Sequence, residues 1–264
     1  MRLKDKVIII TGSTMGIGKA IAKRAVAEGA KIILHGLEKE LGLELQDNLG
    51  KKNTVLHIED ISNKGCTDRL VSLAIKTWNR LDCVVNNAAL VINSNIEDTD
   101  KKILENVINI NTIAPLFLIK SALSHLTKTN GVILNIGSVN AWSGEPNLLA
   151  YSISKGALMT MTRNLGDSLH RNYNVRINQI NPGWVLTEKE IARKKEHGLK
   201  NEWFKELPDI YAPSGKIILP DEIASSAIYW LSDESGPISG QVVDLEQYPM
   251  IGRNMAKDST NIPS

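Results

Sequence analysis

The chain has 264 residues, of which 31 are Lys or Arg and 29 are Asp or Glu, so its formal charge at pH 7 is +2. This small surplus excludes a protein dedicated to nucleic-acid backbones, and we expect no nucleic-acid partner. Hydrophobic residues make up 42% and charged residues 23%, as in folded globular domains, so a disordered chain is also excluded. The length fits one large α/β domain, predicted over residues 1–264.

The sequence shows no signal for a membrane or a metal. No apolar run reaches the roughly eighteen residues of a membrane helix, and the first residues lack the apolar stretch of a signal peptide. We therefore expect a cytoplasmic protein with no membrane partner. Cys66 and Cys83 are isolated, and the histidines lack metal-ligand spacing, so neither a disulfide nor a metal site is expected.

Short β-branched runs alternate with amphipathic segments along the whole chain. The predicted strands are 7–10, 31–35, 54–58, 82–85, 131–136, 175–180 and 241–245, and the predicted helices are 20–28, 39–48, 63–78, 101–128, 151–171 and 220–231. The strands are apolar without alternation, as strands covered on both faces are. We therefore predict an α/β fold with one doubly wound, seven-stranded parallel sheet flanked by helices.

Two segments interrupt or follow this alternation. Residues 186–219 have the weakest pattern and contain Pro208 and Pro213, so we interpret them as a lid over the ligand crevice. Within them, the charged run 188–195 is interpreted as a solvated helix face. Residues 246–264 are predicted to form a C-terminal tail.

A glycine-rich loop joins the first strand to the first helix. Gly12, Gly16 and Gly18 let the backbone turn and approach a phosphate, and the N–H groups at the start of a helix favour an anion. The spacing Gly-x-x-x-Gly-x-Gly differs from the general dinucleotide fingerprint, so the loop alone gives moderate support for a nucleotide site.

The end of the second strand bears on the choice of coenzyme. A carboxylate there would bind the adenosine ribose and repel a 2′-phosphate, but the position holds Gly36, followed by Leu37. The sequence therefore leans to NADP over NAD. Glu38 remains a possible ribose acceptor and Lys39 a possible phosphate partner, and the alternative for both is a solvated helix start.

Four further stretches complete a recognisable set: Asn86-Asn87-Ala88-Ala89, Asn111, Ser138 and Tyr151-x-x-x-Lys155. With the glycine loop, they make the chain resemble the short-chain dehydrogenase/reductase family over about residues 6–245. The resemblance implies a Rossmann domain that binds NAD(P). The coenzyme-binding residues it implies are Gly12, Ser13, Met15, Gly16, Ile17, Gly18, Gly36, Asp60, Ile61, Asn87, Ala88, Ala89, Tyr151, Lys155, Pro182, Gly183, Val185 and Thr187.

The chain departs from the family pattern at two places. Ala89 replaces a glycine, which adds only a methyl group. The usual Asp-Gly-Gly after the last strand is replaced by the run Glu246 to Arg253, so inferences about that edge of the sheet do not carry over.

The catalytic residues implied are Asn111, Ser138, Tyr151 and Lys155. Tyr151 and Lys155 lie one helical turn apart and share a face. A free tyrosine has a pKa near 10, so we expect the lysine and a cationic nicotinamide to favour the phenolate and make Tyr151 a general acid/base. By resemblance, Ser138 orients the carbonyl, Lys155 also binds the nicotinamide ribose, and Asn111 holds a water of a proton relay.

Four residues near this set are candidates for binding substrate. We expect Glu145 and Asn147 to bind substrate hydroxyls and Trp142 or Trp184 to pack on a sugar or polyol. The alternative is equally open, since tryptophans commonly fill cores and Glu145 could simply be solvated.

These observations favour an NAD(P)-dependent oxidoreductase acting on a secondary alcohol or ketone of a small polar substrate, such as a sugar, polyol or sugar acid. The alternative enzyme is a 3-oxoacyl-thioester reductase serving an acyl carrier protein. A cofactor-sensing regulator without turnover is disfavoured by the complete catalytic set. The resemblance also implies a homodimer or homotetramer formed through the helices that begin near residues 101 and 151.

Overall fold

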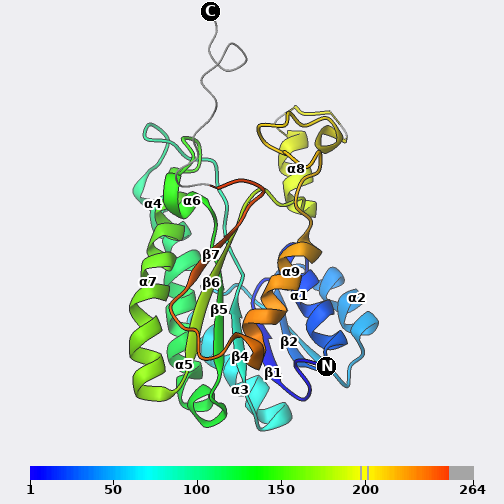
Figure 1. Cartoon of the computed structure of the whole chain (residues 1–264), viewed down its shortest axis with the longest axis vertical. Helices are drawn as coiled ribbons and strands as arrows, with labels where there is room; N and C mark the ends of the chain where they lie inside the picture. The colour runs from blue at the N-terminus through cyan, green and yellow to red at the C-terminus, as the bar shows by residue number, and fades with distance from the viewer. Residues whose placement is uncertain (197, 201, 250–264) are drawn as a thin grey trace, which may run out of the picture.

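A parallel seven-stranded sheet forms the centre of the computed structural model, which describes residues 1–196, 198–200 and 202–249 (Figure 1). The strand order is β3-β2-β1-β4-β5-β6-β7, so the direction of winding reverses between β1 and β4. The predicted doubly wound sheet is confirmed. Its strands are β1 (Val7–Ile10), β2 (Lys31–Gly36), β3 (Thr54–Ile58), β4 (Cys83–Asn86), β5 (Val132–Ile136), β6 (Arg176–Pro182) and β7 (Val242–Leu245).

Helices cover both faces of this sheet, because successive strand side chains point to opposite faces. In β1, Ile8 and Ile10 pack with α1 and α9, whereas Val7 and Ile9 pack with α3, α5 and α7. The helices are α1 (Gly16–Ala27), α2 (Lys39–Leu49), α3 (Cys66–Trp78), α4 (Lys101–Ile108), α5 (Ala114–Thr129), α6 (Asn140–Ser143), α7 (Leu149–Tyr173), α8 (Glu188–Glu196) and α9 (Pro220–Leu231).

The helix predicted over residues 101–128 forms over Lys101–Thr129, but it is not α-helical throughout. A π-helical segment, Asn109–Ile113, separates α4 from α5, and Pro115 follows in the first turn of α5, where its missing N–H costs little. By length and composition alone, Lys101–Thr129 could span a membrane. In this fold its inner face, including Val107, Leu118 and Leu126, is buried, as in the core helix of a folded domain.

The carboxyl half of the sheet contains a buried chain of polar side chains that the apolar strand pattern did not predict. Asn86 of β4 donates to Asn135 of β5 over 2.8 Å, and Asn135 donates to Thr162 of α7 over 2.8 Å. Thr162 in turn donates to Gln179 of β6, also over 2.8 Å. The members of this chain are at most 3% exposed, so each satisfies a partner that would otherwise be buried unpaired.

The same chain continues to the edge of the sheet and the loop after β5. Gln179 donates to Asn181 Oδ1 over 2.7 Å, and Asn181 donates to Asp244 of β7 over 2.9 Å. Asn181 Oδ1 also accepts the backbone N–H of Ser138 at 3.1 Å. A Cβ on Gly137 would lie 2.0 Å from that oxygen, so this loop position requires glycine. This series of hydrogen-bonded side chains therefore fixes where the loop carrying Ser138 leaves the sheet.

Two glycines of α7 give a direct test of packing at the edge of the sheet. A Cβ on Gly166 would lie 2.2 Å from the Cα of Gly240, whereas a Cβ on Gly156 would meet only Ala141 O at 3.7 Å. We expect Gly166→Ala to lower the free energy of unfolding in urea by about 2 kcal/mol or more, because backbone must move. Gly156→Ala should be neutral or stabilising by up to about 1 kcal/mol, since alanine favours helix. Equal effects of the two substitutions would contradict this packing.

Candidate active site

A cavity of about 810 Å³ opens at the carboxyl ends of β4, β5 and β6, between α6 and the lid. Figure 1 shows α6 and α8 beyond the same end of the sheet. This is where parallel α/β sheets bind ligands, near the reversal of strand order. Of the residues that the sequence predicted, the cavity is lined by Ile17, Asn87, Ala89, Ser138, Glu145, Tyr151, Lys155, Pro182, Gly183, Trp184, Val185 and Thr187.

The glycine loop is shaped for the close approach of another group. Gly12 has φ +62°, and a Cβ there would lie 2.8 Å from the Cα of Ala88. A Cβ on Gly18 would lie 2.3 Å from Gly12 O. Asn87 holds the loop by donating to the carbonyls of Thr11 and Gly12 over 2.9 and 2.8 Å. Contacts within the chain therefore require glycine at both positions and fix the loop. Ile17 at the start of α1 lines the larger cavity, and the N–H groups of a helix start fit a dinucleotide pyrophosphate.

Not every predicted residue of this loop faces the cleft. The Ser13 hydroxyl is buried and accepts the N–H of His35 at 3.0 Å, and its own N–H donates to His35 O. Ser13 therefore joins the loop to β2, and its predicted contact with the coenzyme stays a prediction. Met15 precedes α1, and Gly16 donates its N–H to Glu188 of the lid over 3.0 Å.

A second, smaller cavity of about 140 Å³ lies beyond the loop, at the ends of β2 and β3. Gly12, Gly36, Asp60, Ile61, Ala88 and Ala89 line it, together with Glu38 and Lys189. Asp60 is held there by accepting the N–H and hydroxyl of Ser62 over 2.8 and 2.7 Å. This arrangement fits the adenosine half of a dinucleotide.

Gly36 has a structural role that the sequence did not reveal. A Cβ at this position would lie 2.3 Å from the Thr14 hydroxyl, so glycine is required by the glycine loop itself. The Thr14 hydroxyl donates to Glu38 over 2.6 Å, and Lys189 of the lid lies 3.0 Å from the same carboxylate. These hydrogen bonds and the Lys189 charge outweigh burial and lower the pKa of Glu38 to about 2.

Tyr151, Lys155 and Ser138 meet at the floor of the larger cavity. The Lys155 ammonium lies 5.6 Å from the centroid of the Tyr151 ring and donates to Ile136 O over 2.7 Å. Burial raises the pKa of Tyr151 to about 12, although the hydrogen bond with Ser138 and the charge of Arg193 lower it. Burial also lowers the pKa of Lys155 to about 7. In the protein without coenzyme, burial therefore raises the pKa of Tyr151, although the sequence analysis expected Lys155 and a cationic nicotinamide to lower it.

Asn111 lies at the π-helical segment and is 1% exposed. Its amide donates to Leu90 O and to the Ser154 hydroxyl over 3.0 and 2.9 Å, and its Oδ1 accepts the N–H of Leu90. Asn111 therefore joins the strand-following loop to α7 beside Lys155. Its predicted part in a water relay remains a prediction.

The four candidate substrate residues separate into two groups. Glu145 and Trp184 line the larger cavity, whereas Trp142 and Asn147 are not among its lining residues. The Trp142 indole donates to Asp244 over 2.9 Å, and the Arg163 guanidinium lies 4.7 Å from its ring. Trp142 therefore packs at the end of β7, and of the two tryptophans expected to pack on a substrate only Trp184 lines the cavity.

The lid contributes charged side chains whose role the sequence did not predict. Glu188 accepts from Gly16 and lies 3.7 Å from Lys19, and Lys189 reaches Glu38. Glu190, Arg193 and Lys194 line the larger cavity. The run 188–195 is thus not only a solvated face, because these side chains face the cleft. The position of this run directly after Thr187, a predicted coenzyme residue, indicated that it lies near the cleft. The pattern of charges alone could not show which side chains face the cleft.

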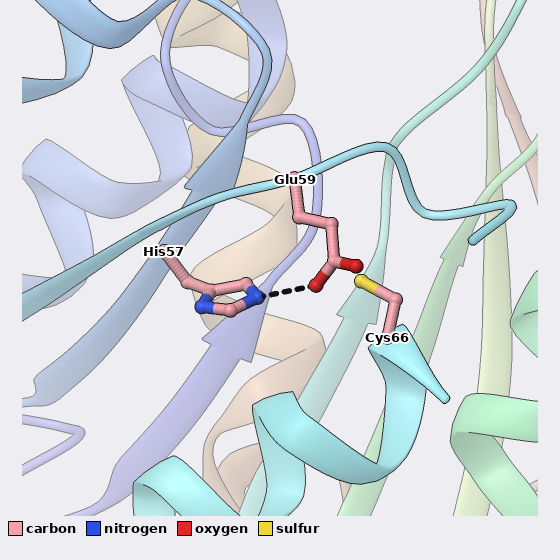
Figure 2. A group of neighbouring side chains, drawn as sticks. All are labelled: His57, Glu59 and Cys66. Carbon is pink, nitrogen blue, oxygen red and sulfur yellow. Dashed lines mark hydrogen bonds and ion pairs between the residues drawn. The ribbon is translucent and has the colours of Figure 1, made fainter. Parts of the chain in front are cut away.

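The structure also brings together His57, Glu59 and Cys66, whose ligand atoms lie within 4.8 Å of one another (Figure 2). The His57 ring lies 2.8 Å from Glu59, and Arg69 donates to the same carboxylate. The hydrogen bonds from Arg69 and His57 lower the pKa of Glu59 to about 2. Because a guanidinium already occupies the carboxylate that a cation would need, we interpret this cluster as an ion-pair network joining β3 to α3.

Comparisons with known proteins agree with this site. The family model described as Enoyl-(Acyl carrier protein) reductase matches residues 12–246. An NADP-dependent (R)-specific alcohol dehydrogenase from Lentilactobacillus kefiri is 30% identical over 239 residues, covering 89% of this chain and 92% of the relative. A 3-oxoacyl acyl-carrier-protein reductase from Thermotoga maritima is 30% identical over 261 residues, covering 93% and 98%.

A third relative, a meso-2,3-butanediol dehydrogenase from Serratia marcescens, is 28% identical over 249 residues, covering 93% of this chain and 95% of its own. The doubly wound sheet, the glycine loop and the Ser-Tyr-Lys cavity define a nicotinamide-dependent oxidoreductase. The chain belongs to the short-chain dehydrogenase/reductase family, and it is an NAD(P)-dependent enzyme of that family.

The lowered pKa of Lys155 gives a test in the coenzyme-free protein. Its folded pKa, about 7, is below the ordinary 10.5, so the unfolded state binds more protons between these values and stability rises with pH in that window. We expect the free energy of unfolding to rise from pH 7 to 9.5 in the wild type and to rise less in Lys155→Met. Urea unfolding at several pH values measures both. Parallel profiles for the two proteins would contradict the burial of this ammonium.

Proposed function

We propose that this enzyme interconverts a secondary alcohol and a ketone on a small polar substrate such as a sugar, polyol or sugar acid. The observation that carries the proposal is the meeting of Ser138, Tyr151 and Lys155 in one cavity beside the glycine loop. The relatives named as alcohol and butanediol dehydrogenases support a small substrate.

Each residue of the proposed active site has a separate role in the reaction. A bound nicotinamide supplies or accepts the hydride. Tyr151 transfers the proton at the substrate oxygen, and Ser138 holds that oxygen by a hydrogen bond. Lys155 places positive charge beside the phenol and binds the nicotinamide ribose. Pro182, Gly183, Val185 and Thr187 form the wall on which the nicotinamide packs.

The choice of coenzyme depends on Glu38 and Lys189, which line the adenosine side together. An ionised Glu38 accepts from a ribose hydroxyl and repels a 2′-phosphate, whereas Lys189 attracts the phosphate. The relative named as NADP-dependent supports the lean to NADP. In that case Lys189 exchanges its bond with Glu38 for one with the phosphate.

A 3-oxoacyl-thioester reductase is the second candidate, supported by the description of the family model and by the Thermotoga relative. Its substrate would reach the cavity on a carrier protein. Turnover of 3-oxoacyl thioesters, and none of small polar ketones, would favour it.

We also propose a homo-oligomer. Ile113, Leu116 and Phe117 of the π-helical segment and α5, with Ile153 of α7, are 40–49% exposed. Such exposed apolar side chains on two neighbouring helices fit a twofold interface, forming a dimer or a tetramer.

Removing the phenol hydroxyl tests the proposed acid/base. We expect Tyr151→Phe to lower kcat by roughly 10²- to 10⁴-fold, as loss of a general acid/base does, while reduced coenzyme still binds. Initial rates across sugars, polyols, hydroxy acids and their oxidised forms, with NAD(H) and NADP(H), measure the first effect. Coenzyme fluorescence measures the second. Full activity in the variant would refute the assignment.

The coenzyme argument predicts the effect of neutralising Glu38. Because Glu38→Gln removes a negative charge next to Lys189, we expect the ratio of kcat/KM for NADP to that for NAD to rise by about tenfold. Glu40→Gln, an exposed neighbour on α2, is the matched control. If the two variants leave the ratio equally unchanged, Glu38 does not face the 2′ position.

A further inference from the structure

Arg193 of the lid lies on the wall of the catalytic cavity. It shares that cavity with Ser138 and Tyr151, and its side chain is 25% exposed. Its positive charge lowers the pKa of Tyr151, whereas the charge of the neighbouring Glu190 raises it, so both members of this ion pair act on the phenol. No role in acid/base chemistry or coenzyme binding has been assigned to it.

The two edges of the Arg193 guanidinium are bonded to different extents. Nε and Nη2 donate to the two oxygens of Glu190 over 2.9 and 3.0 Å, a bidentate pair on one edge. The other edge is formed by Nη1 and the second hydrogen of Nη2, where Asn93 Oδ1 lies 3.5 Å from Nη1. A guanidinium presents five hydrogens in a fixed fork, so this second edge matches another planar carboxylate.

Glu190 keeps the guanidinium in place. Its Oε1 accepts the Trp184 indole N–H at 2.7 Å, and its backbone N–H donates to the Thr187 hydroxyl over 3.1 Å. Trp184 and Thr187 both belong to the segment after β6 that forms the cavity wall. The segment after β6 therefore holds Glu190, and Glu190 holds Arg193, so the arginine side chain loses little conformational entropy when a ligand binds.

The same contacts weaken the alternative that Trp184 stacks on a sugar. Trp203 stacks on the Trp184 ring with centroids 5.0 Å apart, and the Lys194 ammonium lies 5.1 Å from that ring. Trp203 and Lys194 therefore cover part of the Trp184 ring and reduce the area on which a sugar could stack. Trp142 lies outside the cavity lining, whereas the Arg193 guanidinium lies within it.

We propose that the substrate carries a carboxylate near its reacting carbinol or carbonyl carbon, and that Arg193 binds this carboxylate. The substrate class is then a hydroxy acid, or the corresponding oxo acid, including acids of the sugar series. Glu190 and Trp184 are positioning residues for Arg193. This inference rests on the proposed function, since it concerns the substrate of the same cavity.

Binding of an unreactive acid tests the inference without turnover. Oxamate and oxamide have nearly the same shape, but only oxamate carries a carboxylate. We expect oxamate to bind the complex of the full chain with reduced coenzyme at least tenfold more tightly than oxamide does, measured by coenzyme fluorescence. Arg193→Gln should remove roughly ten- to a hundredfold of the oxamate affinity, the range for a lost hydrogen bond to a charged group. Arg193→Lys should restore part of it.

Turnover gives the second readout and separates the two proposals. We expect kcat/KM for oxo acids to exceed that for their methyl esters in the wild type, and the advantage to fall in Arg193→Gln mainly through KM. Lys195→Gln, on the same helix but not among the cavity lining, is the control. Equal affinities for oxamate and oxamide, or loss of affinity equal in the control, would overturn the inference. Tyr151-dependent turnover of neutral ketones would then leave the proposed function intact.

Discussion

The buried chain of polar side chains across β4 to β7 is the constraint on which the site depends. It runs from buried Asn86 to the exposed carboxylate of Asp244, and loss of any one hydrogen bond would leave at least one buried polar group unpaired, at a cost of about 1–3 kcal/mol. Asn181 Oδ1 within it also accepts the backbone N–H of Ser138 and occupies the space that a Cβ on Gly137 would need. Sheet register, the Ser138 loop and the end of β7 are therefore fixed together.

Residues 186–219, interpreted from the sequence as a lid, make the second set of contacts at the site. The first helix of this lid, α8, contacts the glycine loop through Glu188, the adenosine side through Lys189 and the catalytic cavity through Arg193. One short charged helix thus touches both halves of a dinucleotide cleft and the substrate space. These contacts join the segment after β6 to the glycine loop and to the cavity that holds the buried phenol and ammonium.

Much of the fold could be predicted from the sequence because it depends on local pattern. The apolar strands and the glycine loop gave the parallel sheet, and the Tyr151 and Lys155 spacing gave one helical face. The π-helical segment at Asn111 could not be predicted, since a long-range bond to Leu90 accompanies it. The hydrogen bonds of Trp142 and Ser13 could not be predicted because residue type does not reveal orientation. The cleft-facing charges of α8 depend on partners distant in sequence.

The central claim is direct hydride transfer between nicotinamide and a substrate carbon in the Tyr151 cavity. The most direct test uses reduced coenzyme carrying deuterium at C4 of the nicotinamide, a ketone substrate and ordinary water, with the product examined by mass spectrometry and NMR. The account predicts one deuterium on the carbinol carbon and a solvent proton on its oxygen. Deuterium released to water, or coenzyme bound without any transfer to any ketone or oxo acid, would contradict it.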